Sequence, residues 1–386
     1  MTHQHDAARL ATEIASLGGR ADGPSSDLSD SNEQLVRSRP RQKHGAVWWL
    51  SHALAWLTAL SLVVVASLRI FAHDASHLLI WLNAFTRYVY LPAYACLAWA
   101  AWQRRWLLAL FTLPVIACHV IWLAPDFRRD RRFVIASDAS ASIADEPTTI
   151  RIFFGNVAAD NNDPYSYLRE IADANPDIVV LAEYYRRWQL LVASSPQMRP
   201  YRFGTHTTIP FVGEIGIFSK LPIERAKQIW TAQRLNYTFD VRVDGAPLRL
   251  FCVHAPRPMD MPLQDYEGYW KKALPIILSQ PDPAVIIGDF NATQYSHVIQ
   301  ALTADRLRSA HEDRGRGYAT TWPNGVYPLP PIRIDQAFVT PGVECVRIVE
   351  GRGLGSDHKP LILDVQIRSG AQGRPQKPTR TDQVAK

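Results

Sequence analysis

The segment AVIIGDFN, residues 284–291, places an unbroken apolar run directly before Gly288, Asp289 and Asn291. A short apolar run bounded by Gly and Asp is typical of a fully buried strand. Side chains that follow such a strand stand on a loop held by a rigid sheet, where binding and catalytic groups concentrate. The segment therefore predicts a central strand with a candidate site at its carboxyl end.

The same pattern recurs on both sides of this segment. Strand-like runs occur at TIRIFFG (149–155), DIVVLAE (177–183), EIGIFSK (214–220), LNYTFDVRV (235–243), LRLFCVH (248–254), RIDQAFV (333–339) and PLILDVQI (360–367). Helical patterns lie between some of them, at 166–174, 184–194 and 265–279, and we expect Pro275 to break or kink the last one. Mixed strands and helices predict an α/β domain over residues 148–368.

Polar side chains fall at the ends of these runs. They belong to the hard oxygen and imidazole set that suits Mg²⁺ and phosphate chemistry. One such residue alone could be a turn former or a strand cap, but the ordered set indicates a site. No CxxC or HExxH motif points to zinc. The set comprises Asn156, Glu183, His254, Asp289, Asn291, Asp335, Asp357 and His358.

The order of these motifs resembles the endonuclease/exonuclease/phosphatase superfamily. The resemblance rests on Asn156, DIVVLAE ending at Glu183, IGIFSKLPI, His254, GDFN (288–291), RID (333–335) and SDH (356–358). DNase I-like nucleases, sphingomyelinases and inositol polyphosphate 5-phosphatases share that fold. The resemblance covers about 148–368 and implies an α+β fold, a four-layer αββα sandwich.

The chemistry of phosphoesters suggests roles for these residues. The reaction needs a cation on a non-bridging oxygen and a deprotonated water in line with the bond that breaks. Glu183, a carboxylate at the mouth of the sheet, is the best candidate Mg²⁺ (or Mn²⁺) ligand. The resemblance implies that Asn156 and Asp357 complete or support the metal shell.

The remaining residues would act on the substrate and on water. Asp289 would orient or deprotonate the water, and Asn291 would donate to a phosphate oxygen. His358 would contact the phosphate, while Asp335 would fix its tautomer and raise its basicity. His254 would lie near the leaving group, as in the DNase, sphingomyelinase and phosphatase branches of the superfamily.

Residues 47–124 differ sharply from the rest of the chain. This stretch of 78 residues holds only five charged residues and eight of the twelve tryptophans, which excludes a purely cytoplasmic protein. Its apolar runs predict three membrane spans at about 47–68, 78–101 and 106–124. The second contains Asn83 and Arg87, and we expect Arg87 to snorkel or to contact a lipid phosphate.

Many of the positive residues behind the formal net charge of +6 lie beside these spans. Arginines and a lysine at 37–43 and arginines at 128–132 flank the apolar stretch, where they serve topology and contact anionic lipid. With the N-terminus inside, the inner flanks carry six positive residues and the outer flanks five. We therefore expect a multi-pass cell-membrane protein whose catalytic domain is extracytoplasmic.

The chain is accordingly predicted to have five parts. They are a disordered tail (1–46), three transmembrane helices (47–124), a linker (125–147), the catalytic domain (148–368) and a second disordered tail (369–386). Cys252 and Cys345 lie in strand-like runs, LRLFCVH and VECVRIV, and are expected to be free core thiols, although one bridge between them stays open.

Three substrate classes remain open. A membrane-anchored phosphoesterase would act on a phosphorylated lipid, because tethering raises the effective concentration of such a substrate. Three spans before such a domain also resemble the VanJ-like proteins of glycopeptide resistance, whose implied substrate is undecaprenyl pyrophosphate. A DNase I-like nuclease or a sphingomyelinase-like phosphodiesterase is the alternative.

The residue pattern bears on these alternatives. The basic residues near the motifs form no obvious run that would follow nucleic acid: Arg186, Arg187, Arg199, Arg202, Arg257 and Arg333. A catalytically silent binding module would have lost Glu183, Asp289 or His358, and none is lost. No obligate protein partner is inferred.

Overall fold

The computed structural model describes residues 45–127, 147–206, 215–232, 234–304, 306–325 and 327–368. The predicted tails before residue 45 and after residue 368, and residues 128–146 of the predicted linker, lie outside the described residues. The contacts divide the chain into two units at Leu54 and Ala55. The end of the first apolar helix, the other N-terminal helices and the sandwich all belong to the second unit.

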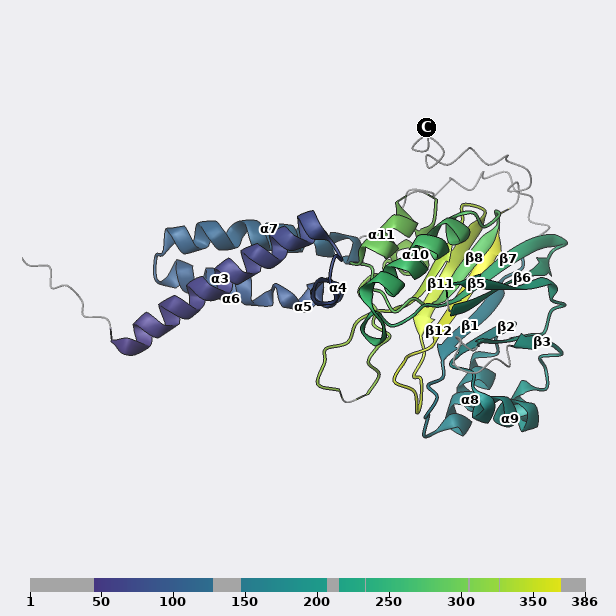
Figure 1. Cartoon of the computed structure of the whole chain (residues 1–386). Coiled ribbons are helices and arrows are strands. Elements are labelled where there is room, and N and C mark those ends of the chain that lie inside the picture. The colour runs from purple at the N-terminus through teal and green to yellow at the C-terminus, as the bar shows by residue number, and fades with distance from the viewer. Residues whose placement is uncertain are drawn as a thin grey trace, which may run out of the picture. The chain divides into compact units, whose positions relative to one another are not determined.

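Two six-stranded sheets form the centre of the fold (Figure 1). The first sheet has the order β11-β12-β1-β2-β4-β3, with β11 Val343–Glu350, β12 Leu361–Ile367, β1 Ile150–Asn156, β2 Ile178–Ala182, β4 Ile215–Ser219 and β3 Phe203–His206. The second has the order β5-β6-β7-β8-β10-β9, with β5 Glu224–Thr231, β6 Arg234–Val243, β7 Ala246–His254, β8 Ala284–Asp289, β10 Asp335–Val339 and β9 Arg308–Ser309.

Successive side chains along each strand point to opposite faces of its sheet, and this alternation separates the core between the sheets from the outer faces that the helices cover. Ile152 and Phe154 of β1 join Val285 and Ile287 of β8 in the core between the sheets. The intervening Phe153 packs on the outer face with α8 (Pro164–Ala174) and α9 (Arg186–Ser194). The other outer face packs against α10 (Leu263–Leu278) and α11 (His297–Thr303). The predicted αββα sandwich is confirmed.

The predicted strands are all found, but some elements were missed. No strand was expected at β3, β5 or β9, and no helix at α11 or α12 (Ala310–Asp313). Pro275 lies inside α10, which continues to Leu278, so a break at Pro275 is wrong, while the alternative of a kink stays a prediction. Cys252 and Cys345 are free and buried, as expected of core thiols.

Two N-terminal helices among the described residues are long and apolar enough to cross a membrane, α3 (Ala46–Ala72) and α7 (Trp106–Phe127). Both present large apolar side chains outward; Leu57 and Leu110, for example, are 66% and 63% exposed. Exposed apolar surface of this extent marks contact with a membrane or a partner.

The second predicted span is wrong as a single helix. It is divided into α4 (His77–Ala84), α5 (Thr86–Val89) and α6 (Leu91–Trp102). The break has a polar cause, because Arg69 Nη1 donates to Asn83 Oδ1 at 3.0 Å and to Thr86 Oγ1 at 2.7 Å. The 12 residues of α6 rise only about 18 Å, less than the hydrocarbon core of a bilayer.

Arg87 fixes this break to the sandwich and does not point into lipid. Its Nη2 forms an ion pair with Asp126 Oδ2 at 2.8 Å, and its Nη1 donates to the Tyr318 carbonyl at 2.8 Å. Asp126 also accepts from the hydroxyl of Tyr295. The expectation that Arg87 snorkels or contacts a lipid phosphate is therefore wrong in this structure.

Candidate functional site

Adjacent strands of the second sheet bring His254, Asp289 and Asp335 together. In the parallel pair of β7 and β8, His254 is in register with Asp289. In the antiparallel pair of β8 and β10, Asp289 is in register with Asp335. Because β7 and β8 end where β10 begins, the three side chains lie at one edge of the sheet, and all three are buried.

The first sheet contributes Asn156 and Glu183. Asn156 pairs with Ala182 across β1 and β2, so Glu183 follows directly at the same edge. The Asn156 side-chain amide donates to Glu183 Oε1 and to Asp289 Oδ2, each at 3.1 Å, and thereby links the two sheets. Its Oδ1 accepts the backbone N–H of Ala158 at 3.1 Å. Asn156 thus orients the two carboxylates in this structure.

The backbone at two site residues is unusual. Glu183 and Asn291 have φ of 56° and 47°, a left-handed conformation that is uncommon for residues with a side chain and gathers at functional sites. Gly288 is required for a different reason, because a Cβ there would lie 2.0 Å from the Val253 carbonyl oxygen. The GDFN segment therefore positions Asp289 through a close approach of β7 and β8.

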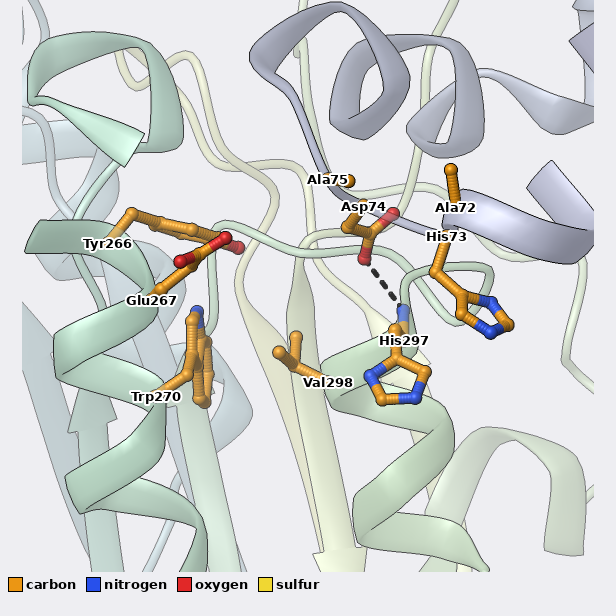
Figure 2. A pocket seen from close by; sticks show the side chains of 9 residues that line it. All are labelled: Ala72, His73, Asp74, Ala75, Tyr266, Glu267, Trp270, His297 and Val298. Carbon is orange, nitrogen blue, oxygen red and sulfur yellow. Dashed lines mark hydrogen bonds between the residues drawn. The ribbon is translucent and has the colours of Figure 1, made fainter. Parts of the chain in front are cut away.

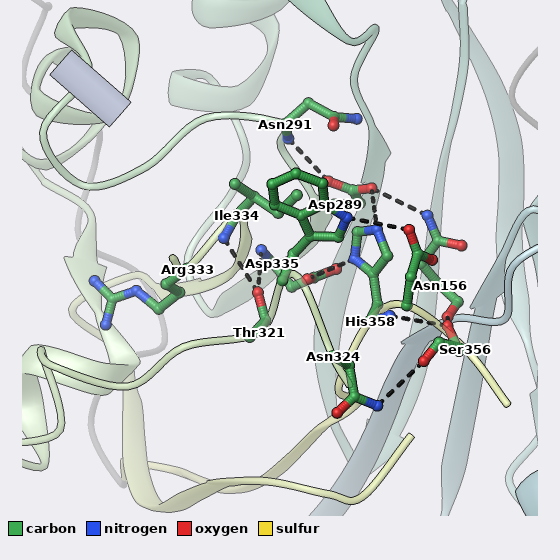
Figure 3. A network of polar contacts seen from close by, with 12 residues as sticks. Asn156, Asp289, Asn291, Thr321, Asn324, Arg333, Ile334, Asp335, Ser356 and His358 are labelled. Carbon is green, nitrogen blue, oxygen red and sulfur yellow. Dashed lines mark hydrogen bonds and ion pairs between the residues drawn. The ribbon is translucent and has the colours of Figure 1, made fainter. Parts of the chain in front are cut away.

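The imidazole of His358 lies between two carboxylates, as Figure 3 shows. Its Nδ1 is 2.9 Å from Asp335 Oδ2, and its Nε2 is 3.9 Å from Asp289 Oδ2. Ser356 Oγ accepts the His358 backbone N–H at 3.0 Å and donates to the Asn156 carbonyl at 2.7 Å, which ties the SDH segment to β1. Burial disfavours the charged imidazole, but Asp335 and Asp289 outweigh it and raise the pKa of His358 to about 10.

The two other acidic groups are shifted in opposite directions. Burial, reinforced by Asp335, raises the pKa of Asp289. Burial opposes the ionisation of Glu183 too, but His254, the Asn156 amide and Arg257 outweigh it and lower the pKa of Glu183. A carboxylate with a raised pKa suits proton transfer, whereas one that stays ionised suits a cation.

The donor set fits a divalent cation. Ligand atoms of Asp289, Asp335 and His358 lie within 4.8 Å of one another. Two buried atoms, Asp335 Oδ1 and His254 Nδ1, have no hydrogen-bond partner among the described residues. Buried polar atoms are normally satisfied, so these two mark a place for a cation, water or substrate. The predicted ligand set of Asn156, Glu183 and Asp357 stays a prediction.

Asn291 and Asp357 face the open side of the site. Asn291 Nδ2 donates to the Ala255 carbonyl at 2.9 Å, and since an amide carries two hydrogens, one donor remains for a phosphate oxygen. Asp357 Oδ2 accepts from Trp322 Nε1 at 3.1 Å. All eight predicted residues are thus gathered around the edges of the two sheets, while their catalytic roles stay predictions.

A cavity of about 330 Å³ adjoins these residues. The polar part of its lining contains Arg257, Asn291, Asp357 and His358. An apolar part comes from α4 and the residue that follows it, within the segment predicted to lie in the membrane: Ile80, Trp81, Ala84 and Phe85. Residues of the candidate site and residues of the N-terminal apolar segment therefore line one cavity.

A second cavity, of about 340 Å³, lies beside the turn between α3 and α4 (Figure 2). Asp74 in that turn accepts the backbone N–H of His297 at the start of α11 through Oδ2, at 2.8 Å. Its Oδ1 accepts from Asn83 Nδ2 at 2.6 Å. Asp74 thus attaches the helical segment to α11 and adds to the contacts that hold α4 against the site.

The sequence indicated no positioning contacts for three further residues that shape the site. Thr321 Oγ1 accepts the backbone N–H groups of Ile334 and Asp335, each at 3.1 Å, and so fixes the start of β10. Asn324 Nδ2 donates to the Ser356 carbonyl at 3.1 Å. Arg257 Nη2 forms an ion pair with Glu183 Oε1 at 2.8 Å. The sequence places Arg257 among the basic residues near the motifs, but no spacing pattern predicts the contacts of these three residues.

Comparison with known proteins identifies one family. The profile of the Endonuclease/Exonuclease/phosphatase family matches residues 154–358, from β1 to His358. No curated protein matches the chain.

Solved structures with similar folds include TDP2 of D. rerio complexed with a single-strand DNA product, at 19% identity and a TM-score of 0.48, covering 57% of this chain and 99% of that chain. Another is an endonuclease/exonuclease/phosphatase from Beutenbergia cavernae, at 18% identity and a TM-score of 0.45, covering 58% of this chain and 72% of that one. A protein of the same description from Bacteroides vulgatus shows 20% identity and a TM-score of 0.45, covering 57% and 100%.

Proposed function

We propose that this chain, which belongs to the endonuclease/exonuclease/phosphatase family, hydrolyses a phosphate ester or anhydride of a lipid at the membrane surface. Membership of the family makes the chain a metal-dependent hydrolase that acts on phosphate bonds. The lipid, the choice of Mg²⁺ (or Mn²⁺) and the side of the membrane are the parts that we propose.

The shared cavity is the observation that supports a lipid substrate. His358 and Asn291 line it together with Trp81 of α4 and Phe85, which directly follows α4 in the N-terminal apolar segment. Apolar walls with a few convergent polar groups are typical of a site for an amphiphile. A phosphate at His358 would leave its apolar tail beside α4.

The residues suggest direct attack by water. A bound Mg²⁺ would supply Lewis-acid activation of the phosphate, with Glu183 as its main holder. Asp289, whose pKa is raised, would accept the proton of the attacking water. His358, held by Asp335, would stabilise the phosphate oxygens, and Asn291 would donate to one of them. The products would be inorganic phosphate or a phosphoalcohol and the remaining lipid.

The arrangement of the helices supports an extracytoplasmic site. Asp126, near the end of α7, binds Arg87 and Gln294, so this end of the helix lies at the sandwich. Arg104 and Arg105 lie directly before the first residue of α7. The 22 residues of this helix rise about 33 Å, so these arginines lie about one membrane thickness from the sandwich end. Positive residues favour the cytoplasmic side. With the N-terminus inside, the inner flanks carry six positive residues and the outer flanks five, the arginines at 128–132 included, which would leave the sandwich outside.

A nuclease is the second candidate. Trp322 and Tyr327 line the cavity and could stack on bases. Against this, Arg257 is the only arginine or lysine among the described residues that line the cavity, and a nucleic-acid site needs several phosphate contacts.

A series of isoprenyl diphosphates of increasing tail length tests the lipid proposal. The purified full chain in detergent should show a KM that falls as the tail lengthens, because α4 buries more of it. Phe85→Ser should flatten this dependence, whereas Leu57→Ser, at an exposed position of α3, should not. A KM that is independent of tail length in the wild type would contradict the proposal.

A further inference from the structure

The structure assigns a substrate-selecting role to Arg257, which follows β7 in the loop that carries the short helix η2 (Pro258–Asp260). We propose that Arg257 binds a second phosphate group, next to the one that reacts, and thereby selects diphosphates over substrates with a single phosphate. The inference deepens the proposed function and rests on it for the identity of the lipid, but the diphosphate preference is tested separately.

The position of Arg257 supports this role. It lines the same cavity as Asn291, Asp357 and His358. It is the only arginine or lysine in that lining among the described residues. A diphosphate carries more negative charge than a single phosphate, and the guanidinium of Arg257 is the permanent cation that the described part of the lining offers to meet the additional charge.

The ion pair of Arg257 with Glu183 suggests how the guanidinium becomes available to a phosphate group. Its Nη2 binds Glu183 Oε1 at 2.8 Å, while the Arg257 side chain is 49% exposed. A cation held by Glu183 would compete with the guanidinium for the same oxygen. The half-exposed side chain would then be free to turn toward an anion in the cavity without any change of the sheets.

In the proposed reaction, the second phosphate belongs to the leaving group. Water attacks the terminal phosphorus, the bond from that phosphorus to the bridging oxygen breaks, and the bridging oxygen keeps the electron pair as part of the departing lipid monophosphate. The proton of the water passes to Asp289. Arg257 would bind the phosphate of the departing group and stabilise the charge that develops there.

Two measurements on the purified full chain test the role. The first is Mn²⁺ affinity without substrate, by electron paramagnetic resonance. Arg257→Gln removes the competitor for Glu183, so the Kd should fall about tenfold, the range expected for one charge-assisted contact. A merely structural arginine would leave the Kd unchanged or raise it, and either result would overturn the proposal.

The second measurement compares two probes without a lipid tail, methylenediphosphonate and methylphosphonate, as inhibitors of a chromogenic phosphodiester at saturating Mn²⁺. Arg257→Gln should raise the inhibition constant of the diphosphonate about tenfold or more and change that of the phosphonate less than about twofold. Arg257→Lys, which keeps the charge, should recover part of the affinity. Equal changes for both probes would overturn the proposal.

Arg242→Gln is the matched control, because Arg242 forms an ion pair with Glu224 at 2.9 Å on β5, outside the cavity lining. It should alter neither the Mn²⁺ affinity nor the inhibition constants. The probes lack a tail, so the expected shifts support the role of Arg257 even where lipid diphosphates prove not to be substrates; in that case the proposed function fails and the diphosphate preference stands.

Discussion

Nδ1 of His358 lies 2.9 Å from Oδ2 of Asp335, and both side chains are almost fully buried. The pair crosses from the SDH loop to the first residue of β10, so it forms only when both segments are in place. It therefore couples the stability of the fold to the protonation of the site.

The metal-free protein should lose stability as pH rises through the alkaline range. The folded pKa of His358 is about 10, above its ordinary value of 6.5, so its contribution is complete below pH 6.5 and disappears as pH approaches 10. The difference in Tm between wild type and His358→Gln, measured in EDTA, should therefore shrink across this window. His254→Gln is the control, because burial lowers the pKa of His254 and places its effect below pH 6.5. A difference that grows with pH would contradict the assignment.

Removal of the site's acid–base groups should abolish most activity. His358→Ala and Asp289→Asn should each lower kcat by roughly 10²–10⁴, the range for a positioned acid–base group. Asp335→Asn should have a smaller effect because it only orients the imidazole. The double variant of Asp335 and His358 should resemble His358→Ala alone in steady-state kinetics. Additive losses would show that the two residues act separately.

Glu183 should determine the metal requirement. EDTA should remove activity, and Mg²⁺ or Mn²⁺ should restore it. Glu183→Gln keeps the shape of the side chain but removes its charge, so the concentration of metal needed for half-maximal activity should rise and kcat should fall. Full activity of this variant at low Mg²⁺ would show that Glu183 is not a ligand.

The ion pair between Arg87 and Asp126 should hold the helical segment to the sandwich. Asp126 is fully buried, so Asp126→Asn should lower the free energy of unfolding by about 3 kcal/mol, as expected when one partner of a buried pair is removed. Thermal unfolding in detergent, followed by near-UV circular dichroism, measures this. Glu224→Gln breaks the exposed ion pair with Arg242 and should lower the free energy of unfolding by less than about 1 kcal/mol. Equal effects of the two variants would contradict a structural role for Asp126.

The buried strands were predictable because their sequences are locally informative. The apolar run of β8, bounded by Gly288 and Asp289, is typical of a central strand, and its end position placed Asp289 next to the ends of the neighbouring strands. By contrast, β5 has the sequence ERAKQIWT and is mostly exposed at the edge of its sheet, so its residues lack an apolar pattern. Edge strands are specified by their neighbour more than by their own composition.

The helical segment was harder to predict for a related reason. The apolar composition of residues 78–101 is that of a membrane-spanning helix. Only the side-chain contacts of Asn83 and Thr86 with Arg69 show why the helix is interrupted between α4 and α5. Such contacts join residues far apart in the chain, which no local pattern reveals. For the same reason the sequence did not indicate that α4 lines the candidate site, or that Arg257 binds Glu183.

The most direct test of the account is phosphate release by the purified full chain from a panel of undecaprenyl pyrophosphate, sphingomyelin, inositol phosphates and DNA, with and without Mg²⁺. We predict Mg²⁺-dependent release of phosphate from the lipid pyrophosphate in detergent, its loss in Asp289→Asn, and no phosphoryl-enzyme on acid quench. Ready degradation of DNA without phosphate release from the lipid would contradict the proposed substrate, and a trapped phosphoryl-enzyme would contradict direct attack by water.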